Sequence, residues 1–266
     1  MSIYRDKPPA HREVLICAGL DPSGGAGFIA DTRVVAALGA RPVGIVTALT
    51  VQNTLGVQAV HPCDAEIVGA QLASLLGDVE VHAVKLGMLG SPQITREIAY
   101  GLDLTAAPVV WDPVAAPSRG RVIFDADSFD EMLKLLGPHV TVVTPNIIEL
   151  GLLVGSEVTS RDGAIAAART LSERIGKADV LVKGGHFNDA DNAIDLLVME
   201  DRVEEFAGAR IGGDDVHGTG CALSSAIATY LALGVDIVNA CRQAKQFVAA
   251  QIAAPVRPGR GAPAVV

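Results

Sequence analysis

A glycine-rich tetrapeptide directly before an apolar helical segment is the part of this sequence best suited to chemistry. Residues 218–221 read Gly-Thr-Gly-Cys, and no charged residue follows until after Val235. Glycines at the start of a helix let backbone N–H groups point at an anion, and the helix dipole adds positive potential there. Gly218, Thr219 and Gly220 could therefore hold a phosphate group while it is transferred.

Cys221 would lie in the first turn of that helix, a position that lowers the pKa of a thiol. It could then accept a proton from a substrate hydroxyl. The alternative is a plain glycine-rich turn followed by a small buried cysteine. The acidic pair Asp214-Asp215 just upstream favours function, and His217 borders the loop and is expected to line the site.

A second glycine-rich loop, residues 21–27, reads Asp-Pro-Ser-Gly-Gly-Ala-Gly after the first apolar run. Gly25 and Gly27 could bring the backbone close to a ligand, and Asp31 follows about one helical turn later. A dinucleotide-binding fingerprint is not favoured, because the acidic residue expected at the end of the next strand is replaced by Gln52. A tight turn without a ligand is the other interpretation.

Two carboxylates and a lysine stand at predicted strand ends. Asp112 precedes a proline, Glu149 follows Asn146 by three residues, and Lys183 precedes two glycines. Carboxylates near a phosphate can hold Mg²⁺ directly or through water. Asn146 and Glu149 also have the spacing of a helix capping box, so capping is the alternative for that pair. Lys183 would offset nucleotide charge if it faces the phosphates, and otherwise would be a surface lysine beside a turn.

The elements that must position these residues alternate between short apolar runs and helical segments. Strands are predicted at residues 14–18, 43–51, 81–86, 108–111, 140–143, 180–182, 193–199 and 202–206. Helices are predicted at residues 28–38, 64–76, 92–102, 164–175, 220–233 and 237–253. This alternation predicts a parallel α/β sheet with right-handed crossovers, and the last two strands predict a hairpin.

Ligands of such sheets bind beyond the carboxyl ends of the strands. The residues singled out above, together with one methionine, fall at those ends: Asp21, Gln52, Met88, Asp112, Asn146, Glu149 and Lys183. Six strand ends meeting at one edge predict an active-site cleft.

Composition sets the class of protein. Half of the 266 residues are hydrophobic and only 4% are aromatic, which fits a buried sheet and helices rich in Val, Leu, Ile and Ala. The net charge of −9 argues against nucleic-acid and membrane-surface binding. The four cysteines suit neither a zinc site nor a disulfide framework, so free thiols in a cytoplasmic protein are expected.

Domain organisation is predicted to be simple. The sequence has no internal repeat and no interdomain linker, so residues 1–266 are expected to form one domain. Residues 255–266 contain three prolines and are expected to be an arm or disordered. The N-terminal residues lack the apolar core of a signal peptide.

These motifs, in this order, resemble the hydroxymethylpyrimidine/phosphomethylpyrimidine kinase family of the ribokinase-like superfamily. Residues 48–57 (Ala-Leu-x-x-Gln-Asn-Thr-x-Gly-Val) and 85–89 (Lys-x-Gly-Met-Leu) add to a resemblance that runs from Val14 to about Ala250. The ending Gly-Thr-Gly-Cys is specific, because most ribokinase-like enzymes place Asp where this chain has Cys221.

The resemblance implies a three-layer α/β/α fold with a mainly parallel central sheet. It implies ATP-dependent phosphorylation of 4-amino-5-hydroxymethyl-2-methylpyrimidine and then of its monophosphate in thiamine biosynthesis. ATP and Mg²⁺ would be the cofactors, the partners would be small molecules only, and the protein would form a homodimer.

The resemblance also implies a role for each site residue. Gln52 would hydrogen-bond the aminopyrimidine and Met88 would pack on its ring, while Asp31 and the loop containing Gly25 and Gly27 would border the substrate. At the phosphate end, Asp112 and Glu149 would bind Mg²⁺, with Asn146 nearby. Lys183 and Thr219 would contact the ATP phosphates. Gly218–Cys221 would form an anion hole, with Cys221 as the base.

One stretch departs from the family pattern. Asp112-Pro113-Val114 is followed by Ala115, where the family usually has Met, and Pro117 and Arg119 are added. This change could alter which pyrimidine is accepted and favour the monophosphate. Residues 118–127 are also expected to be a flap that could close over the site.

Two alternatives remain open. The first is a pyridoxal or pyridoxine kinase on the same fold, since some of these kinases share the Gly-Thr-Gly-Cys ending; the segments around Gln52 and Met88 favour the pyrimidine. The second is a non-catalytic ligand sensor, which the presence of Lys183, Asp112, Glu149 and Cys221 argues against.

Overall fold

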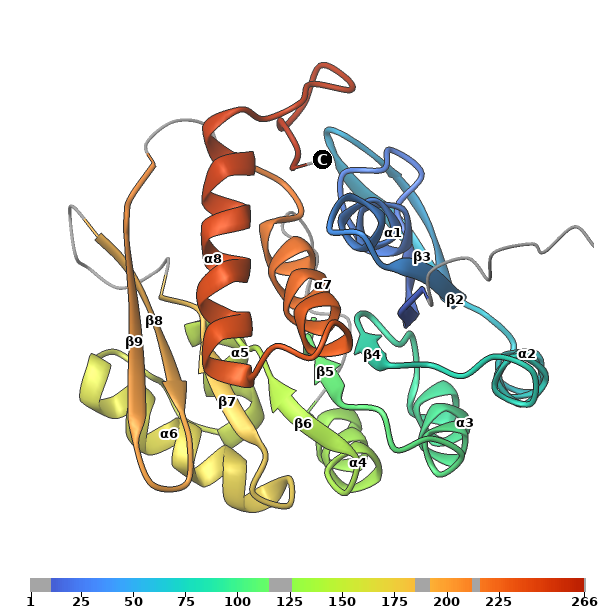
Figure 1. Ribbon diagram of the computed structural model, residues 1–266, viewed down its shortest axis with the longest axis horizontal. Helices are drawn as coiled ribbons and strands as arrows, with labels where there is room; N and C mark the ends of the chain where they lie inside the picture. Colours follow the sequence, from blue (N-terminus) through green and yellow to red (C-terminus); the bar gives the residue numbers. More distant parts are fainter. Residues whose placement is uncertain (1–10, 115–125, 185–191, 212–215, 266) are drawn as a thin grey trace, which may run out of the picture.

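A mixed nine-stranded sheet forms the centre of the computed structural model, which describes residues 11–114, 126–184, 192–211 and 216–265 (Figure 1). Its strands lie in the order β3-β2-β1-β4-β5-β6-β7-β8-β9. Strands β1, β2, β4, β5, β6 and β7 are parallel, and β3, β8 and β9 are antiparallel additions at the two edges. The strands span Glu13–Leu20, Arg41–Asn53, Gly56–Pro62, Ala83–Leu86, Val109–Trp111, Val140–Val143, Asp179–Val182, Asn192–Val198 and Val203–Ala209, from β1 to β9.

Helices cover both faces of this sheet. One face carries α2 (Ala65–Leu76), α3 (Pro92–Leu102), α4 (Ala126–Leu136), α5 (Ile147–Val154) and α6 (Arg161–Arg174). The other carries α1 (Gly27–Ala37), α7 (Thr219–Ala232) and α8 (Ile237–Ala253). The three-layer α/β/α arrangement with a mainly parallel sheet is therefore confirmed.

The central strands are apolar on both sides because both faces are covered. Along β1, Leu15 and Cys17 pack into the core on the α2–α6 face, whereas Val14, Ile16 and Ala18 pack into the core on the α1–α7–α8 face. Successive strand residues point to opposite faces, so a strand buried on both faces must be apolar at every position.

Most predicted elements lie within a few residues of their observed bounds. The sequence did not indicate β3, which is short and half-exposed, or the amphipathic α4. Helix α5 begins with the capping box suspected for Asn146 and Glu149, since each of these residues accepts a hydrogen bond from the backbone N–H of the other. None of the helices in the described part of the chain has the length and apolar character that a membrane span requires.

A fully buried ion pair joins α1, the helix that follows the glycine-rich loop at residues 21–27, to the sheet. The Lys85 ammonium on β4 lies 2.6 Å from Asp31 Oδ2 on α1, and the Ser225 hydroxyl on α7 donates to Asp31 Oδ1 at 2.7 Å. Burial raises the pKa of Asp31, and Lys85 opposes that rise. Burial lowers the pKa of Lys85, but the nearby Asp31 carboxylate outweighs it and holds that pKa above its usual range. The ion pair and the serine hydroxyl thus connect β4, α1 and α7.

Replacing Lys85 with Met should lower the free energy of unfolding by about 3–5 kcal/mol, because Asp31 would then be a buried carboxylate without its cation. The double variant Lys85→Met/Asp31→Asn removes both charges and should recover most of that loss. Urea-induced unfolding measures both. A single variant as stable as the double variant would contradict the charged pair.

Candidate active site

A cavity of about 990 Å³ opens along the carboxyl ends of the parallel strands. Its wall includes a predicted residue at or after each of the six strands, namely Asp21 (β1), Gln52 (β2), Met88 (β4), Asp112 (β5), Asn146 and Glu149 (β6) and Lys183 (β7). The predicted convergence of strand ends is confirmed.

Two glycine-rich loops meet backbone to backbone at this cavity. Gly218, the residue before α7, has a φ of +84°, and a Cβ there would lie 2.0 Å from the Gly25 carbonyl oxygen. Gly27 has a φ of +57°, and its Cβ would lie 2.3 Å from the Gly19 carbonyl oxygen. Only glycine fits either position, because a side chain would require both a left-handed backbone and space that is already filled.

The contact of the loops leaves the first turn of α7 facing the cavity. Thr219, Gly220 and Cys221 line the wall, and no side chain caps the helix. The first N–H groups of a helix have no partner within it, so this end can bind an anion. Gly25 is buried behind the wall and supports Gly218, whereas Gly27 is part of the wall.

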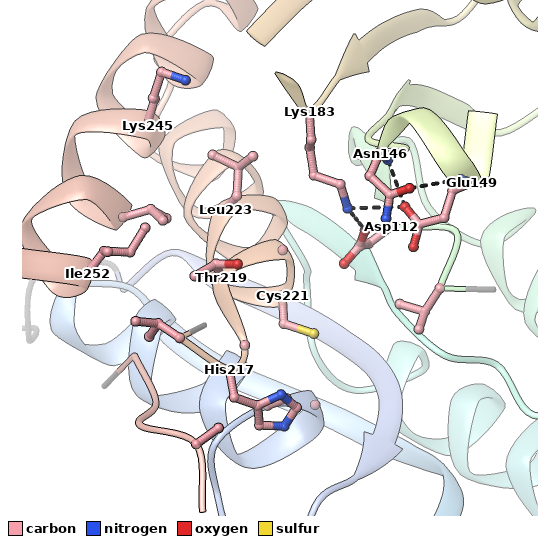
Figure 2. Close-up of a pocket in the computed structure, with 18 of the residues that line it drawn as sticks. Asp112, Asn146, Glu149, Lys183, His217, Thr219, Cys221, Leu223, Lys245 and Ile252 are labelled. Atoms are coloured by element: carbon pink, nitrogen blue, oxygen red, sulfur yellow. Dashed lines mark hydrogen bonds and ion pairs between the residues drawn. The ribbon is translucent and has the colours of Figure 1, made fainter. Parts of the chain in front are cut away.

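The Cys221 thiol lies between the His217 imidazole and the Asp112 carboxylate (Figure 2). Burial raises its pKa to about 11; Lys85 and a hydrogen bond from the Gly27 backbone oppose the rise, and Asp31 and Asp112 add to it. The predicted lowering of this pKa is therefore wrong. The helix start was visible in the sequence, but the two buried carboxylates beside the thiol were not.

In the cavity wall, the Lys183 ammonium makes ion pairs with the carboxylates of Asp112 and Glu149 (Figure 2). The ammonium nitrogen lies 2.8 Å from Asp112 Oδ1 and 3.3 Å from Glu149 Oε2. Burial lowers the pKa of Lys183, but the two carboxylates outweigh burial and hold that pKa above its usual range. Burial raises the pKa of Glu149, which Lys183 opposes. A Cβ added to Gly220 would lie 3.2 Å from this ammonium, so the lysine adjoins the start of α7.

Asp112 and Glu149 fit a Mg²⁺ ion that is bound together with a phosphate ligand. Their oxygens already share one cation, the Lys183 ammonium. The described residues contain no group of three or more His, Cys, Asp or Glu side chains that could hold a metal. Mg²⁺ usually takes one or two protein carboxylates and completes its shell with water and substrate phosphates, so this pair suffices.

Asp195 on β8 and Lys245 on α8 are site residues that the sequence motifs did not reveal. Asp195 Oδ1 accepts a hydrogen bond from Gly184 N at 2.8 Å, and Asp195 Oδ2 lies 2.7 Å from the Lys245 ammonium. Asp195 therefore fixes the backbone directly after Lys183. A single acidic residue in the apolar run 193–198 was the available signal.

The cavity continues past Lys183 into an apolar recess between β8, β9 and α8. Side chains that line it include Phe206, Leu223, Val248, Ala249 and Ile252. Arg242 stacks over Phe206 with its guanidinium carbon 5.6 Å from the ring centroid. A recess of this kind suits a flat heterocyclic ring.

His217 organises the opposite end of the cavity. Its Nε2 lies 3.1 Å from Asp21 Oδ2, to which it donates, and 3.2 Å from Gln52 Nε2, so the imidazole contacts both the loop after β1 and β2. Burial raises the pKa of Asp21, but hydrogen bonds from His217 and Ser23 outweigh it and hold that pKa below its usual range. Gln52 lies against the imidazole at the cavity wall, with Met88 also in the wall.

Asp31 does not stand where the sequence placed it. Its side chain is fully buried against Lys85 and is absent from the cavity wall. Asp31 therefore supports the site from beneath, and the predicted contact with substrate is corrected. The departure at Ala115–Arg119, residues 118–125 of the expected flap, and Asp214-Asp215 lie outside the described residues.

Residues 21–265 match the sequence profile of the family described as phosphomethylpyrimidine kinase. The chain belongs to this family. The hydroxymethylpyrimidine/phosphomethylpyrimidine kinase of Staphylococcus aureus (strain MRSA252) is 36% identical to it over 248 residues, which cover 93% of this chain and 90% of that protein. The resemblance suggested by the motifs is confirmed.

Solved structures of phosphomethylpyrimidine kinase and of pyridoxal kinase share the fold. The phosphomethylpyrimidine kinase from Clostridium difficile 630 has a TM-score of 0.79 and 33% identity, covering 91% of this chain and 99% of its own. The pyridoxal kinase from Staphylococcus aureus, solved in complex with ADP, has a TM-score of 0.88 and 28% identity, covering 97% of this chain and 93% of its own. The fold is thus that of the ribokinase-like kinases.

Alkylation of Cys221 should be slow at neutral pH. With a pKa of about 11, roughly one Cys221 thiol in a thousand is ionised at pH 8, against about one in four for an unperturbed cysteine. The raised pKa keeps the thiol protonated, so the rate with iodoacetamide should increase about tenfold per pH unit from pH 7.5 to 9.5.

Peptide mass spectrometry would follow Cys221 alone, with glutathione as the unperturbed control. A rate that reaches a plateau below pH 9 would contradict the raised pKa.

Proposed function

We propose that this chain phosphorylates hydroxymethylpyrimidine and then its monophosphate, using ATP and Mg²⁺, to supply the pyrimidine diphosphate for thiamine biosynthesis. One observation carries the proposal most directly. The uncapped start of α7 adjoins the Lys183–Asp112–Glu149 cluster on one side and the His217–Gln52 pair on the other. A phosphate donor and a neutral heterocyclic acceptor can therefore meet at the same helix end.

The two ends of the cavity suit different ligands. The apolar recess of β8, β9 and α8 suits the adenine of ATP, which places the phosphates beside Lys183 and Thr219. The wall at Gln52 and Met88 suits the aminopyrimidine, because an amide can exchange hydrogen bonds with an aminopyrimidine edge. ADP is the ligand named in the solved complex of the related pyridoxal kinase, which supports the assignment of the nucleotide.

Lys183 is proposed to change partners during binding. The ammonium is paired with both Asp112 and Glu149. When the nucleotide enters, a phosphate oxygen would attract Lys183, and the two carboxylates would be left to hold Mg²⁺. The bound ion supplies charge neutralisation of the transferring phosphoryl group.

The two transfers place different demands on Cys221. A hydroxymethyl group must lose its proton when it attacks phosphorus. A phosphate monoester, whose second pKa is near 6, is already largely ionised at pH 7. Cys221, proposed as the proton acceptor, should therefore matter for the first transfer, and its raised pKa means that only the small thiolate fraction can serve.

Three further properties stay predictions: one domain over residues 1–266, a cytoplasmic location and a homodimer. Exposed apolar side chains on the β2–β3 hairpin support the homodimer, since Leu49, Val51 and Leu55 are 51%, 47% and 61% exposed.

Pyridoxal phosphorylation is the second candidate function. The structural match to the Staphylococcus aureus pyridoxal kinase, also solved in complex with pyridoxal, favours it. Both substrates are small heterocyclic alcohols, so the phosphate end of the site would serve either one.

A coupled ATP-turnover assay with Mg²⁺ distinguishes these functions. We expect turnover of hydroxymethylpyrimidine and of its monophosphate, and a lower kcat/KM for pyridoxal. Lys183→Met should reduce the rate by about 100-fold or more through the loss of a phosphate contact, whereas Lys134→Met, at an exposed lysine on α4, should not change it. No turnover of any alcohol or monophosphate would favour a ligand sensor, and a preference for pyridoxal would favour the second candidate.

Cys221→Ala should slow phosphorylation of the alcohol far more than phosphorylation of the monophosphate. In the unchanged chain, the rate for the alcohol should rise with pH between 7 and about 9.5 because the thiolate fraction grows, and this rise should disappear in the variant. Initial rates with each acceptor measure both effects. Equal losses for the two acceptors would leave Cys221 a positional role only.

A further inference from the structure

The stretch from Val256 to Val265, here called the strap, runs back from α8 to the cavity. Figure 1 shows it in red between the end of α8 and the β2–β3 hairpin. Two of its residues are deeply buried, with Ala264 2% and Val265 0% exposed. Of the two interpretations of this stretch from sequence, an arm agrees with this packing and disorder does not.

The strap first holds the backbone of His217. His217 N donates to the Pro263 carbonyl oxygen at 2.8 Å, and Val265 N donates to the His217 carbonyl oxygen at 3.2 Å. The strap also closes on itself, since Val256 and Ala264 exchange two backbone hydrogen bonds of 2.9 Å. Both backbone groups of the residue directly before Gly218 are therefore fixed from outside α7.

The strap also holds the turn of the β2–β3 hairpin. Ala262 N donates to the Thr54 carbonyl oxygen at 3.0 Å, and Gly261 N donates to the Thr54 hydroxyl at 3.1 Å. Thr54 is part of the cavity wall, two residues after Gln52. A Cβ on Gly261 would lie 1.9 Å from the Thr54 carbonyl oxygen, so the approach is possible only for glycine.

We propose that the strap is a positioning element that sets the distance between the bound acceptor and the phosphate-binding start of α7. The acceptor wall at Gln52 belongs to β2, whereas Gly218 lies more than half the chain away in sequence. Besides the His217 side chain, the strap connects these two parts through four backbone N–H donors. In this role the residues of the strap touch no reacting atom. The identity of the acceptor rests on the proposed function.

The nucleotide end is held by other contacts. Asp195 fixes the backbone after Lys183 and the capping box fixes the start of α5, whereas the strap's backbone hydrogen bonds described above go to His217, to Thr54 and within the strap. Loosening the strap should therefore impair the acceptor and leave ATP binding unchanged.

Gly261→Ala is the direct test, because its methyl group cannot fit against the Thr54 backbone. We expect the KM for the acceptor to rise about tenfold and kcat to fall several-fold, with the KM for ATP unchanged within about twofold. Arg260→Ala changes an exposed neighbour in the strap and should match the unchanged chain.

A milder pair of variants covers the case in which Gly261→Ala fails to fold. Val256→Pro removes the N–H that donates to Ala264 and adds nothing near the cavity, whereas Val256→Ala keeps that N–H and changes only a half-exposed side chain. The proline variant should shift the acceptor KM in the same direction by a smaller factor, and the alanine variant should not.

Hydrogen exchange of the ligand-free protein tests the connection without any substrate. Faster exchange of residues 50–57 together with residues 217–220 in Gly261→Ala or Val256→Pro would support the proposal, with α3 as the unchanged reference. Unchanged exchange in both regions, or an equal rise in the KM values for acceptor and ATP, would overturn it. A failure of the unchanged chain to phosphorylate any pyrimidine would instead overturn the proposed function, since the exchange result does not depend on it.

Discussion

Close packing between two glycine-rich loops is the constraint on which the site depends. The Gly25 carbonyl oxygen occupies the space where a Cβ atom of Gly218 would stand, and the Gly19 carbonyl oxygen at the end of β1 does the same for Gly27 within the loop that follows. The N-terminal part of the sheet is thereby brought against the start of α7. One loop follows β1 and the other begins the helix whose N–H groups face the cavity, so in the proposed function both ligands would approach this contact. A side chain at Gly218 would separate the loop after β1 from the start of that helix.

Charge balance beside Cys221 is a second constraint on the site. Two ammonium groups, Lys85 and Lys183, are paired with three carboxylates, Asp31, Asp112 and Glu149. Two positive and three negative charges leave one negative charge in a poorly solvated region. A thiolate at Cys221 would add a second, which agrees with its raised pKa. In the proposed function, the same excess would favour a divalent cation once the phosphates of a nucleotide had drawn Lys183 away from its partners.

Sequence patterns predicted the fold and the strand-end residues well, because a buried parallel sheet imposes continuous apolar runs that end in turns. They could not show on which side of α1 a carboxylate lies, so Asp31 was placed in the cavity although it faces Lys85. The prediction for the pKa of Cys221 was wrong for a related reason: the helix start is visible in sequence, whereas the burial of the thiol and the carboxylates that the fold brings beside it are not. His217 was expected at the site, but its contacts with Gln52 and Asp21 join residues about 165 and 196 positions apart.

The division of the cavity explains how one fold can serve two vitamin-related alcohols. In the proposed function, charged residues and backbone N–H groups form the phosphate end, and they would bind the phosphates of ATP whichever alcohol is the acceptor. The proposed acceptor end consists of Gln52, Met88 and the His217 imidazole, which would contact a ring through hydrogen bonds and packing. A site built to hydrogen-bond a particular group rejects analogues that leave it unpaired. Discrimination between a pyrimidine and a pyridine alcohol should therefore reside in these few neutral contacts and in how firmly they are held, and the phosphate end can stay the same in both kinds of kinase.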